Sequence, residues 1–380
     1  MSIFYMPVKV YEETNAIQNH AKEIAAFGKK ALIVTGRRSA FANGSYADLT
    51  AALEQEGVSF AVYSEVEENP SVHTIIKARD FGIAEKVDFV IGIGGGSPLD
   101  VAKAVAVLGS YGGKITDYEG VGKVTGPVIP MIAIPTTAGT GSEVTSFSVI
   151  TDHSRNYKLT VGSTYLLSKY VILDPELITT VPLKTSAYCG VDALVHALEA
   201  YISLASSPFS DIMALQALEL IGSNIRSYVA DRKDRQAAEG MLLGSLFAGI
   251  AFSHARLGDV HAMSHPVSAF FDVAHGLANA VLLPTVVRFN AQTDTGKYYE
   301  IYRRISLDPV SKEIFKSEML AEELRFLNSS LGIPDSLKEV GVDSSKFEEM
   351  AEDAMKSGNI AVNPRITTKT DILLMYSEAY

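Results

Sequence analysis

Hydrophobic and polar positions follow two different patterns along the chain. Up to about residue 180, short runs rich in β-branched residues alternate with segments of helical period; the runs are 29–36 (KKALIVTG), 58–66 (VSFAVYSEV), 87–96 (VDFVIGIGGG) and 127–137 (PVIPMIAIPTT). This alternation of strand and helix predicts a doubly wound parallel sheet. From about residue 182 the helical period dominates, with long stretches of Ala, Leu and Met. We therefore expect an α/β domain over residues 1–181 and an all-helical domain over residues 182–380.

Composition and charge narrow the class of protein. The chain has 380 residues, 47% hydrophobic and 20% charged, which fits a globular protein of two domains. Its 33 Lys and Arg against 44 Asp and Glu give a net charge of -11 without a basic run, so we expect no nucleic-acid partner. The N-terminus lacks a signal-peptide pattern and the longest apolar stretch, 241–252, is too short to span a bilayer, so we expect a cytoplasmic protein with no membrane partner.

The segment IGIGGGSPLDVAKA, residues 91–104, predicts a strand that runs through glycines into a helix. Glycines let a backbone approach a ligand closely, and the free amides and dipole of a helix start attract an anion such as a pyrophosphate. The spacing is neither the Rossmann fingerprint nor a Walker loop, so an ordinary glycine-rich turn is the alternative. A second loop, PTTAGTGSEVT at 135–145, offers hydroxyls and amides beyond the next strand. Two such loops at one sheet edge would hold a dinucleotide.

Histidine and carboxylate positions in the helical half indicate a metal site. The segment VDALVHALEAY, residues 191–201, predicts a helix with Asp192 and His196 on one face, although an N-terminal Asp and a core His are the plain alternative. Residues 257–280 then hold three of the chain's eight histidines: His261, His265 and His275. The chain's single cysteine excludes a multi-cysteine cage, so any metal must be held by His and carboxylate. Fe(II), Zn(II), Co(II) and Ni(II) all accept such ligands.

Taken together, these motifs resemble the iron-dependent, or group III, alcohol dehydrogenases, which share their fold with dehydroquinate synthases. The resemblance covers essentially the whole chain and rests on five motifs in family order: GGGSPLDVAK (94–103), PTTAGTGSEVT (135–145), GVDALVHALEAY (190–201), HAMSHPVSAFFDVAHGLANA (261–280) and NPRITTKTDILLMYSEAY (363–380). By this resemblance, four residues match the ligands of a catalytic divalent metal, usually iron and sometimes zinc: Asp192, His196, His261 and His275.

The resemblance also implies a nicotinamide dinucleotide site. His265 is similar to a further histidine near the metal and the nicotinamide, and we expect it to move the alcohol proton. The diphosphate contacts are matched by Gly95, Gly96 and Ser97, and the adenosine and ribose path by Thr136, Thr137, Thr140 and Thr145. Asp100 and Lys158 match positions near the nicotinamide ribose and ring, and Asp100 joins His265 as a predicted catalytic residue.

The expected activity is a metal-dependent, NAD(P)-linked alcohol dehydrogenase or aldehyde reductase acting on a small primary alcohol or diol. A divalent cation lowers the pKa of an alcohol oxygen, and hydride then passes to the nicotinamide. The alternatives are a glycerol dehydrogenase-like enzyme, a dehydroquinate synthase-like enzyme and a catalytically silent binder of metal or nucleotide. Four residues are candidates for the substrate pocket or for ordinary core: Phe252, His254 (where relatives commonly have Asn), Phe270 and Phe271.

Two further expectations concern the cofactor and the assembly. Gly36 ends the first strand of the α/β half where many NAD-using relatives carry Asp, and Arg37 and Arg38 follow it. Space and positive charge at that position favour NADP(H), with NAD(H) as the alternative. The resemblance implies a homodimer or larger oligomer, in which residues 3–13 are a candidate for a strand exchanged with the partner.

Overall fold

The computed structural model describes residues 3–155 and 157–380, and these residues divide into two compact units. One unit comprises Tyr5–Val181. The other comprises Pro182–Tyr380 together with the start of the chain up to Phe4. Phe4 stacks within the helical unit on Phe209 and His254, with ring centroids 5.4 and 4.6 Å apart, respectively.

A six-stranded parallel sheet forms the centre of the first unit, and it confirms the predicted α/β architecture. In spatial order its strands are β1 (Lys9–Glu12), β9 (Tyr170–Leu173), β6 (Met131–Pro135), β4 (Phe89–Gly94), β2 (Lys30–Gly36) and β3 (Ser59–Val66). The four predicted runs correspond to β2, β3, β4 and β6. The chain places β3 on one side of β2 and then crosses to place β4 on the other side. The carboxyl ends of β2 and β4 are therefore a topological switch point, where such sheets bind ligands.

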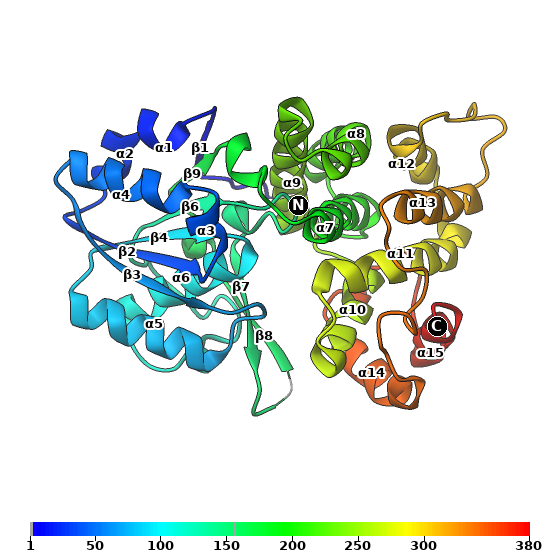
Figure 1. Cartoon of the computed structure of the whole chain (residues 1–380). Helices are drawn as coiled ribbons and strands as arrows, with labels where there is room; N and C mark the ends of the chain where they lie inside the picture. Colours follow the sequence, from blue (N-terminus) through cyan, green and yellow to red (C-terminus); the bar gives the residue numbers. More distant parts are fainter. Residues whose placement is uncertain (1–2, 156) are drawn as a thin grey trace. The chain divides into compact units, whose positions relative to one another are not determined.

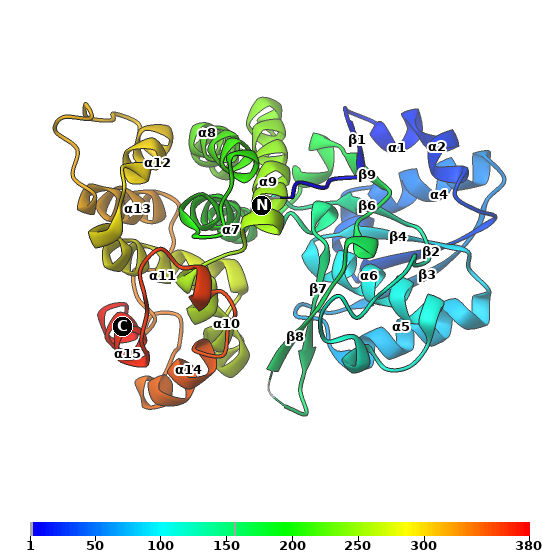
Figure 2. The same cartoon turned by 180° about the vertical axis from the view of Figure 1, so that it is seen from behind.

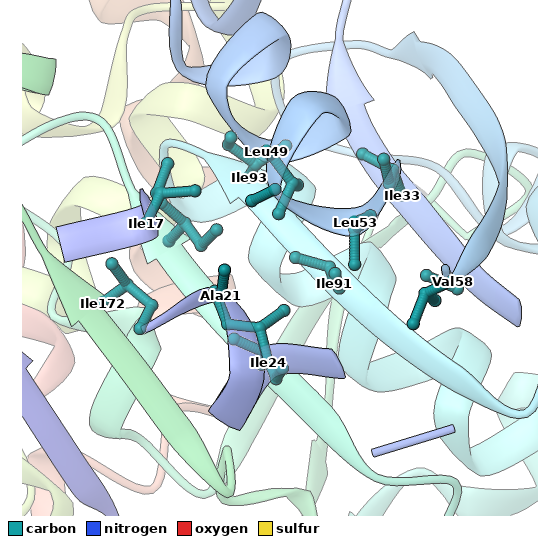
Figure 3. Close-up of a cluster of buried hydrophobic side chains, with 14 of the residues drawn as sticks. Ile17, Ala21, Ile24, Ile33, Leu49, Leu53, Val58, Ile91, Ile93 and Ile172 are labelled. Carbon is teal, nitrogen blue, oxygen red and sulfur yellow. The ribbon is translucent and has the colours of Figure 1, made fainter. Parts of the chain in front are cut away.

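Helices cover both faces of this sheet. On one face lie α1 (Ala16–Asn19), α2 (Ala21–Ala25) and α4 (Ser45–Gln55), and on the other α5 (Val72–Glu85) and α6 (Gly96–Tyr111) (Figures 1 and 2). α3 (Ser39–Ala42) directly precedes α4. Alternate residues of each strand point to opposite faces, so Ile91 and Ile93 of β4 join Leu49 and Leu53 of α4 in a buried aliphatic core (Figure 3). Burial on both faces explains why these strands read as continuous hydrophobic runs.

A small second sheet in this unit was not among the predicted elements. Its strands are β5 (Gly120–Val121), β8 (Tyr157–Gly162) and β7 (Phe147–Asp152), and β7 pairs antiparallel with β8. The burial of β7 alternates between half-buried and buried residues, because only one side chain in two reaches the interior. This hairpin carries Lys158, one of the predicted cofactor residues.

The second unit contains only α-helices and short 3₁₀ turns among its described residues, which confirms the helical prediction. Its helices are α7 (Leu183–Ile202), α8 (Pro208–Ala230), α9 (Arg235–Ala255), α10 (Asp259–Phe271), α11 (His275–Asn290), α12 (Lys297–Ile305), α13 (Glu318–Ser330), α14 (Phe347–Ala354) and α15 (Lys369–Glu378). Helices α7, α8 and α9 pack against one another, and α11 packs on α7 (Figure 1). In the described part of the chain no single helix meets the length and hydropathy of a membrane span, although α9 and α10, bent by 105°, meet them as a pair.

The N-terminal segment pairs within its own chain. Residues Lys9–Glu12 lie parallel to β9, in register with Tyr170–Leu173. The exchange of residues 3–13 with a partner stays a prediction, and within this chain the backbone of residues 9–12 bonds to β9 of its own sheet.

Candidate functional site

Three predicted cofactor segments follow three adjacent strands of the parallel sheet. Gly36 ends β2, the glycines Gly94–Gly96 follow β4, and the threonine loop 136–145 follows β6. Because β2, β4 and β6 are neighbours and parallel, their carboxyl ends meet at one edge of the sheet. The sequence-predicted residues of these segments are thus brought to the switch point.

The glycine loop and the threonine loop lie against each other. A Cβ on Gly96 would lie 2.8 Å from Thr140 Cγ2, and one on Gly95 would lie 3.3 Å from Thr137 Oγ1. Gly95 is the N-cap of α6 and provides no side-chain cap, so the first amides of the helix face this loop without a capping group. The buried hydroxyl of Thr136 has no hydrogen-bond partner among the described residues. Such a helix start with a nearby unsatisfied hydroxyl is suited to an anionic ligand.

A buried lysine holds the threonine loop onto α6. Lys103 Nζ donates to Ser142 Oγ at 2.9 Å, to Thr145 Oγ1 at 2.9 Å and to the Phe147 carbonyl at 2.7 Å. Burial lowers the pKa of Lys103, and the adjacent Asp100 opposes that shift. Sequence reasoning did not assign Lys103 a role, although the quoted glycine motif contains it.

Asp100 belongs to the same network. Its carboxylate accepts from Ser142 Oγ at 2.7 Å and from the backbone amide of Val149 at 3.0 Å, and burial raises its pKa. Asp100 therefore ties α6 to the threonine loop and to β7. The contacts predicted for Asp100 near the nicotinamide ribose and for Thr145 on the adenosine and ribose path stay predictions; the described partners of both side chains belong to the chain itself.

Two other predicted cofactor positions lie near this edge. A Cβ on Gly36 would meet only the Val66 carbonyl oxygen, at an ordinary 3.5 Å, and Arg37 and Arg38 are both exposed. Lys158 Nζ donates to Asn69 Oδ1 at 2.9 Å. Asn69 has a positive φ of 51°, a conformation that Asn tolerates better than most residues.

The predicted metal ligands come together in the helical unit. Asp192 and His196 lie one turn apart on α7, His261 lies in the first turn of α10, and His275 begins α11. Gly276 permits this arrangement, because a Cβ there would collide with the Tyr188 carbonyl oxygen of α7 and lie 3.3 Å from Asp192 Cβ. The glycine after His275 therefore brings the start of α11 directly onto α7.

The donor atoms of Asp192, His261 and His275 form one cluster, and His196 approaches it through Asp192 without belonging to that group. Asp192 Oδ1 lies 3.9 Å from His196 Nε2, 3.9 Å from His261 Nε2 and 3.8 Å from His275 Nε2. Two donors that each bind one ion at about 2.1 Å lie at most about 4.2 Å apart, so these pairs fit a shared ion. The donors of Asp192, His261 and His275 all lie within 4.8 Å of one another, and Asp192 and His261 are buried.

Asn279 marks the point that the donors share. Its Nδ2 donates to Asp192 Oδ1 at 2.6 Å and lies 3.2 Å from Nε2 of both His261 and His275. Asp192 Oδ1 and the Nε2 atoms of His261 and His275 thus lie around one amide nitrogen. Burial, reinforced by His196, lowers the pKa of His261 to about 3, which keeps its imidazole neutral as metal binding requires. The donor set and its protonation therefore fit a borderline divalent cation.

Further predicted residues surround this cluster. His265 lies on α10, one turn beyond His261, with its ring centroid 5.3 Å from that of His275. Phe252 of α9 stacks on His196 at 4.5 Å, so it borders one of the predicted ligands, and its place in a pocket wall stays a prediction. His254 instead stacks on Phe4, and Phe270 packs on Phe271 at 6.5 Å. For these three residues the structure gives packing partners and no described contact with the ligands.

Sequence reasoning missed two polar residues at the cluster, Glu199 and Asn279. Glu199 is 2% exposed, and its Oε2 lies 2.6 Å from His261 Nδ1. Burial raises the pKa of Glu199 to about 7, although hydrogen bonds from backbone amides act to lower it. Both residues had a signal in the sequence, because Glu199 lies three positions after His196 and Asn279 four after His275, on the same helix faces.

Comparison with known proteins gives matches over nearly the whole chain. Residues 7–175 match the family model described as "Iron-containing alcohol dehydrogenase", and residues 186–380 match that of the "Fe-containing alcohol dehydrogenase family, C-terminal". The 1,3-propanediol dehydrogenase of Citrobacter freundii is 36% identical over 93% of this chain and 92% of its own. The structure of the alcohol dehydrogenase from Oenococcus oeni superimposes with a TM-score of 0.96 at 34% identity, covering 100% of both chains. That of sulfoacetaldehyde reductase from Bifidobacterium kashiwanohense in complex with NAD⁺ has a TM-score of 0.88 at 27% identity, covering 100% of this chain and 98% of that one.

Proposed function

Because this chain belongs to the iron-containing alcohol dehydrogenase family, we propose that it interconverts a small primary alcohol or diol and its aldehyde, with a nicotinamide dinucleotide as hydride carrier. The observation that carries the proposal is the convergence of Asp192, His261 and His275. A neutral imidazole at His261, grouped with a second imidazole and one carboxylate, is a donor set suited to a metal ion. Relatives that act on propanediol and on sulfoacetaldehyde support a small substrate.

The metal is held by Asp192, His196, His261 and His275, with iron as the first expectation and zinc as the second. A bound divalent cation would supply Lewis acidity that favours ionisation of an alcohol oxygen. Around it, the stacking of Phe252 on His196 supports an apolar wall that excludes water from the reacting carbon. His265, beside His275, receives the alcohol proton and passes it towards solvent.

The cofactor is held at the sheet edge. Backbone amides at Gly95, Gly96 and Ser97 bind the diphosphate at the start of α6, supported by the absence of a side-chain cap there. Thr136, with its unsatisfied buried hydroxyl, and the neighbouring Thr137 and Thr140 line the adenosine and ribose path. Thr145, bonded to Lys103, belongs to the same path. Lys158, oriented by Asn69, and Asp100 act near the nicotinamide ribose and ring.

NADP(H) is the expected cofactor, because Gly36 leaves space for a 2′-phosphate and the exposed Arg37 and Arg38 supply positive charge. We expect kcat/KM to be higher with NADPH than with NADH. Gly36→Asp should reverse the preference, with a loss of at least about tenfold for NADPH, since a carboxylate repels the phosphate and accepts from a ribose hydroxyl. The control is Ala51→Asp, which adds the same charge at an exposed position of α4 in the same unit. A wild-type preference for NADH would contradict the assignment.

The test of the activity is NAD(P)H oxidation at 340 nm with a panel of short aldehydes. The protein is stripped of metal and then reconstituted anaerobically with Fe(II) or Zn(II). Aldehyde-dependent oxidation that returns only with metal is the expected result. Stoichiometric metal without oxidation of either cofactor would show a silent binder or a different reaction. A homodimer or larger oligomer and a cytoplasmic location stay predictions.

A further inference from the structure

Glu199 connects the two helices that carry three of the metal-binding candidates. It lies on α7, on the face that also carries Asp192 and His196, and its carboxylate contacts two consecutive residues of α10. Oε1 accepts from the backbone amide of Val260 at 2.7 Å, and Oε2 lies 2.6 Å from Nδ1 of His261. Both oxygens of this buried carboxylate therefore contact the first turn of α10, which carries His261.

The start of α10 has no side-chain cap of its own. Its N-cap is Gly258, so the first backbone amides depend on groups from elsewhere in the chain. Val260 N donates to Glu199, and Asp259 N donates to Asn363 Oδ1 at 3.4 Å. A Cβ on Gly258 would lie 3.0 Å from both Glu199 Oε1 and Asn363 Oδ1, so the glycine lets both groups approach. Two distant residues therefore cap this helix.

The same contacts determine which nitrogen of His261 carries a proton. A backbone N–H always donates, so Glu199 Oε1 is committed as an acceptor from Val260. Oε2 of the carboxylate then accepts from Nδ1–H of His261, which leaves the lone pair on Nε2. Asn279 Nδ2 lies 3.2 Å from Nε2 and cannot accept a hydrogen bond, which also favours an unprotonated Nε2. Contacts on opposite sides of the ring thus favour one tautomer, with Nε2 ready to bind a cation beside Asp192.

We propose that Glu199 is a positioning residue of the metal site, which caps α10 and holds His261 as the Nδ1–H tautomer with Nε2 facing Asp192 and His275. The proposal rests on the proposed metal-dependent function, which makes His261 a ligand. The segment between α14 and α15 also contacts the start of α10. Thr367 Oγ1 donates to Asp259 Oδ2 at 2.5 Å, so this segment fixes the same helix start without contacting the His261 ring.

The test is Glu199→Gln, which keeps the size of the side chain. The carboxamide has one acceptor and one donor group. If its oxygen accepts from Val260, its NH₂ donates to Nδ1 and moves the proton of His261 to Nε2; in the opposite orientation its NH₂ faces the Val260 N–H. We expect Zn²⁺ and Co²⁺ to bind about 10- to 100-fold more weakly, measured by chelator competition on the full chain at pH 8. The visible absorption of the Co²⁺ form should change as a ligand is lost.

Matched variants separate positioning from folding. Thr367→Val disturbs the same helix start from the other side and should change metal affinity by less than about threefold, because it leaves the His261 ring bonded. Unfolding of the metal-free variants, followed by circular dichroism, reports any general loss of stability.

A second measurement needs no variant of Glu199. In ¹⁵N-histidine-labelled wild-type protein at pH 8 without metal, the ring that disappears in His261→Gln should show the Nδ1–H pattern. An Nε2–H pattern there, wild-type metal affinity in Glu199→Gln, or an equal loss in Thr367→Val would each overturn the proposal. Failure of the wild-type protein to bind either ion would instead overturn the proposed function on which it rests.

Discussion

Replacing His261 or His275 with alanine should abolish metal binding and lower kcat/KM for aldehyde reduction by on the order of 10³-fold, since Lewis acid stabilisation contributes several kcal/mol. Both imidazoles present Nε2 within 3.9 Å of Asp192 Oδ1. Each substitution therefore removes one donor atom from the cluster. NAD(P)H binding should persist, because the predicted cofactor residues belong to the other unit. Metal content, cofactor fluorescence titration and steady-state rates together measure the effect.

His265→Ala is the matched control for these two variants. It removes a third histidine of the same segment, whose ring centroid lies 6.2 Å from that of His261. The cluster of donor atoms around Asp192 does not include this histidine. It should keep the metal and lower turnover by about 10²-fold, as expected for lost proton transfer. Full activity in His261→Ala or His275→Ala would show that the ligands are misassigned, and so would metal loss in His265→Ala.

Gly96→Ala should weaken NAD(P)H binding by about 10- to 100-fold while the metal site stays intact, because overpacking of this kind costs about 1–3 kcal/mol. The new Cβ would lie 2.8 Å from Thr140 Cγ2, which forces the glycine loop and the threonine loop apart at the start of α6. Fluorescence titration with NADPH and NADH measures the loss, and metal analysis shows that the helical unit is unaffected.

Two variants make this prediction specific. Thr140→Ser deletes the atom nearest to the new Cβ, so the double variant with Gly96→Ala should recover part of the affinity. Gly109→Ala lies on the same helix, far from its start, where the nearest atom is the end of the Ile129 side chain; it should leave cofactor affinity unchanged. Equal cofactor binding by wild type and Gly96→Ala would contradict a diphosphate site at this loop.

The sequence alone predicted the elements whose signal is local. β4 and α6 were predicted from IGIGGGSPLDVAKA, because a buried run, glycines and a proline in the first turn each act on the neighbouring backbone. The small β5–β8–β7 sheet was missed because β7 and β8 mix buried and half-buried residues and so lack a continuous hydrophobic run. The pairing of β1 with β9 joins residues about 160 positions apart, and nothing local to residues 9–12 specifies a parallel partner in the same chain.

The candidate site divides in the same way. The sequence by itself determined which residue types carry the chemistry: Asp192 and His196 share a helix face, and the histidines after residue 260 cluster along the chain. Only the tertiary structure decided that Glu199 contacts His261 and that Asn279 lies among the donors, since these contacts join helices separated by 60 or more positions. Helical spacing shows which side chains share a face. Packing decides what that face meets, and for a buried polar group the partner determines the protonation and the chemistry.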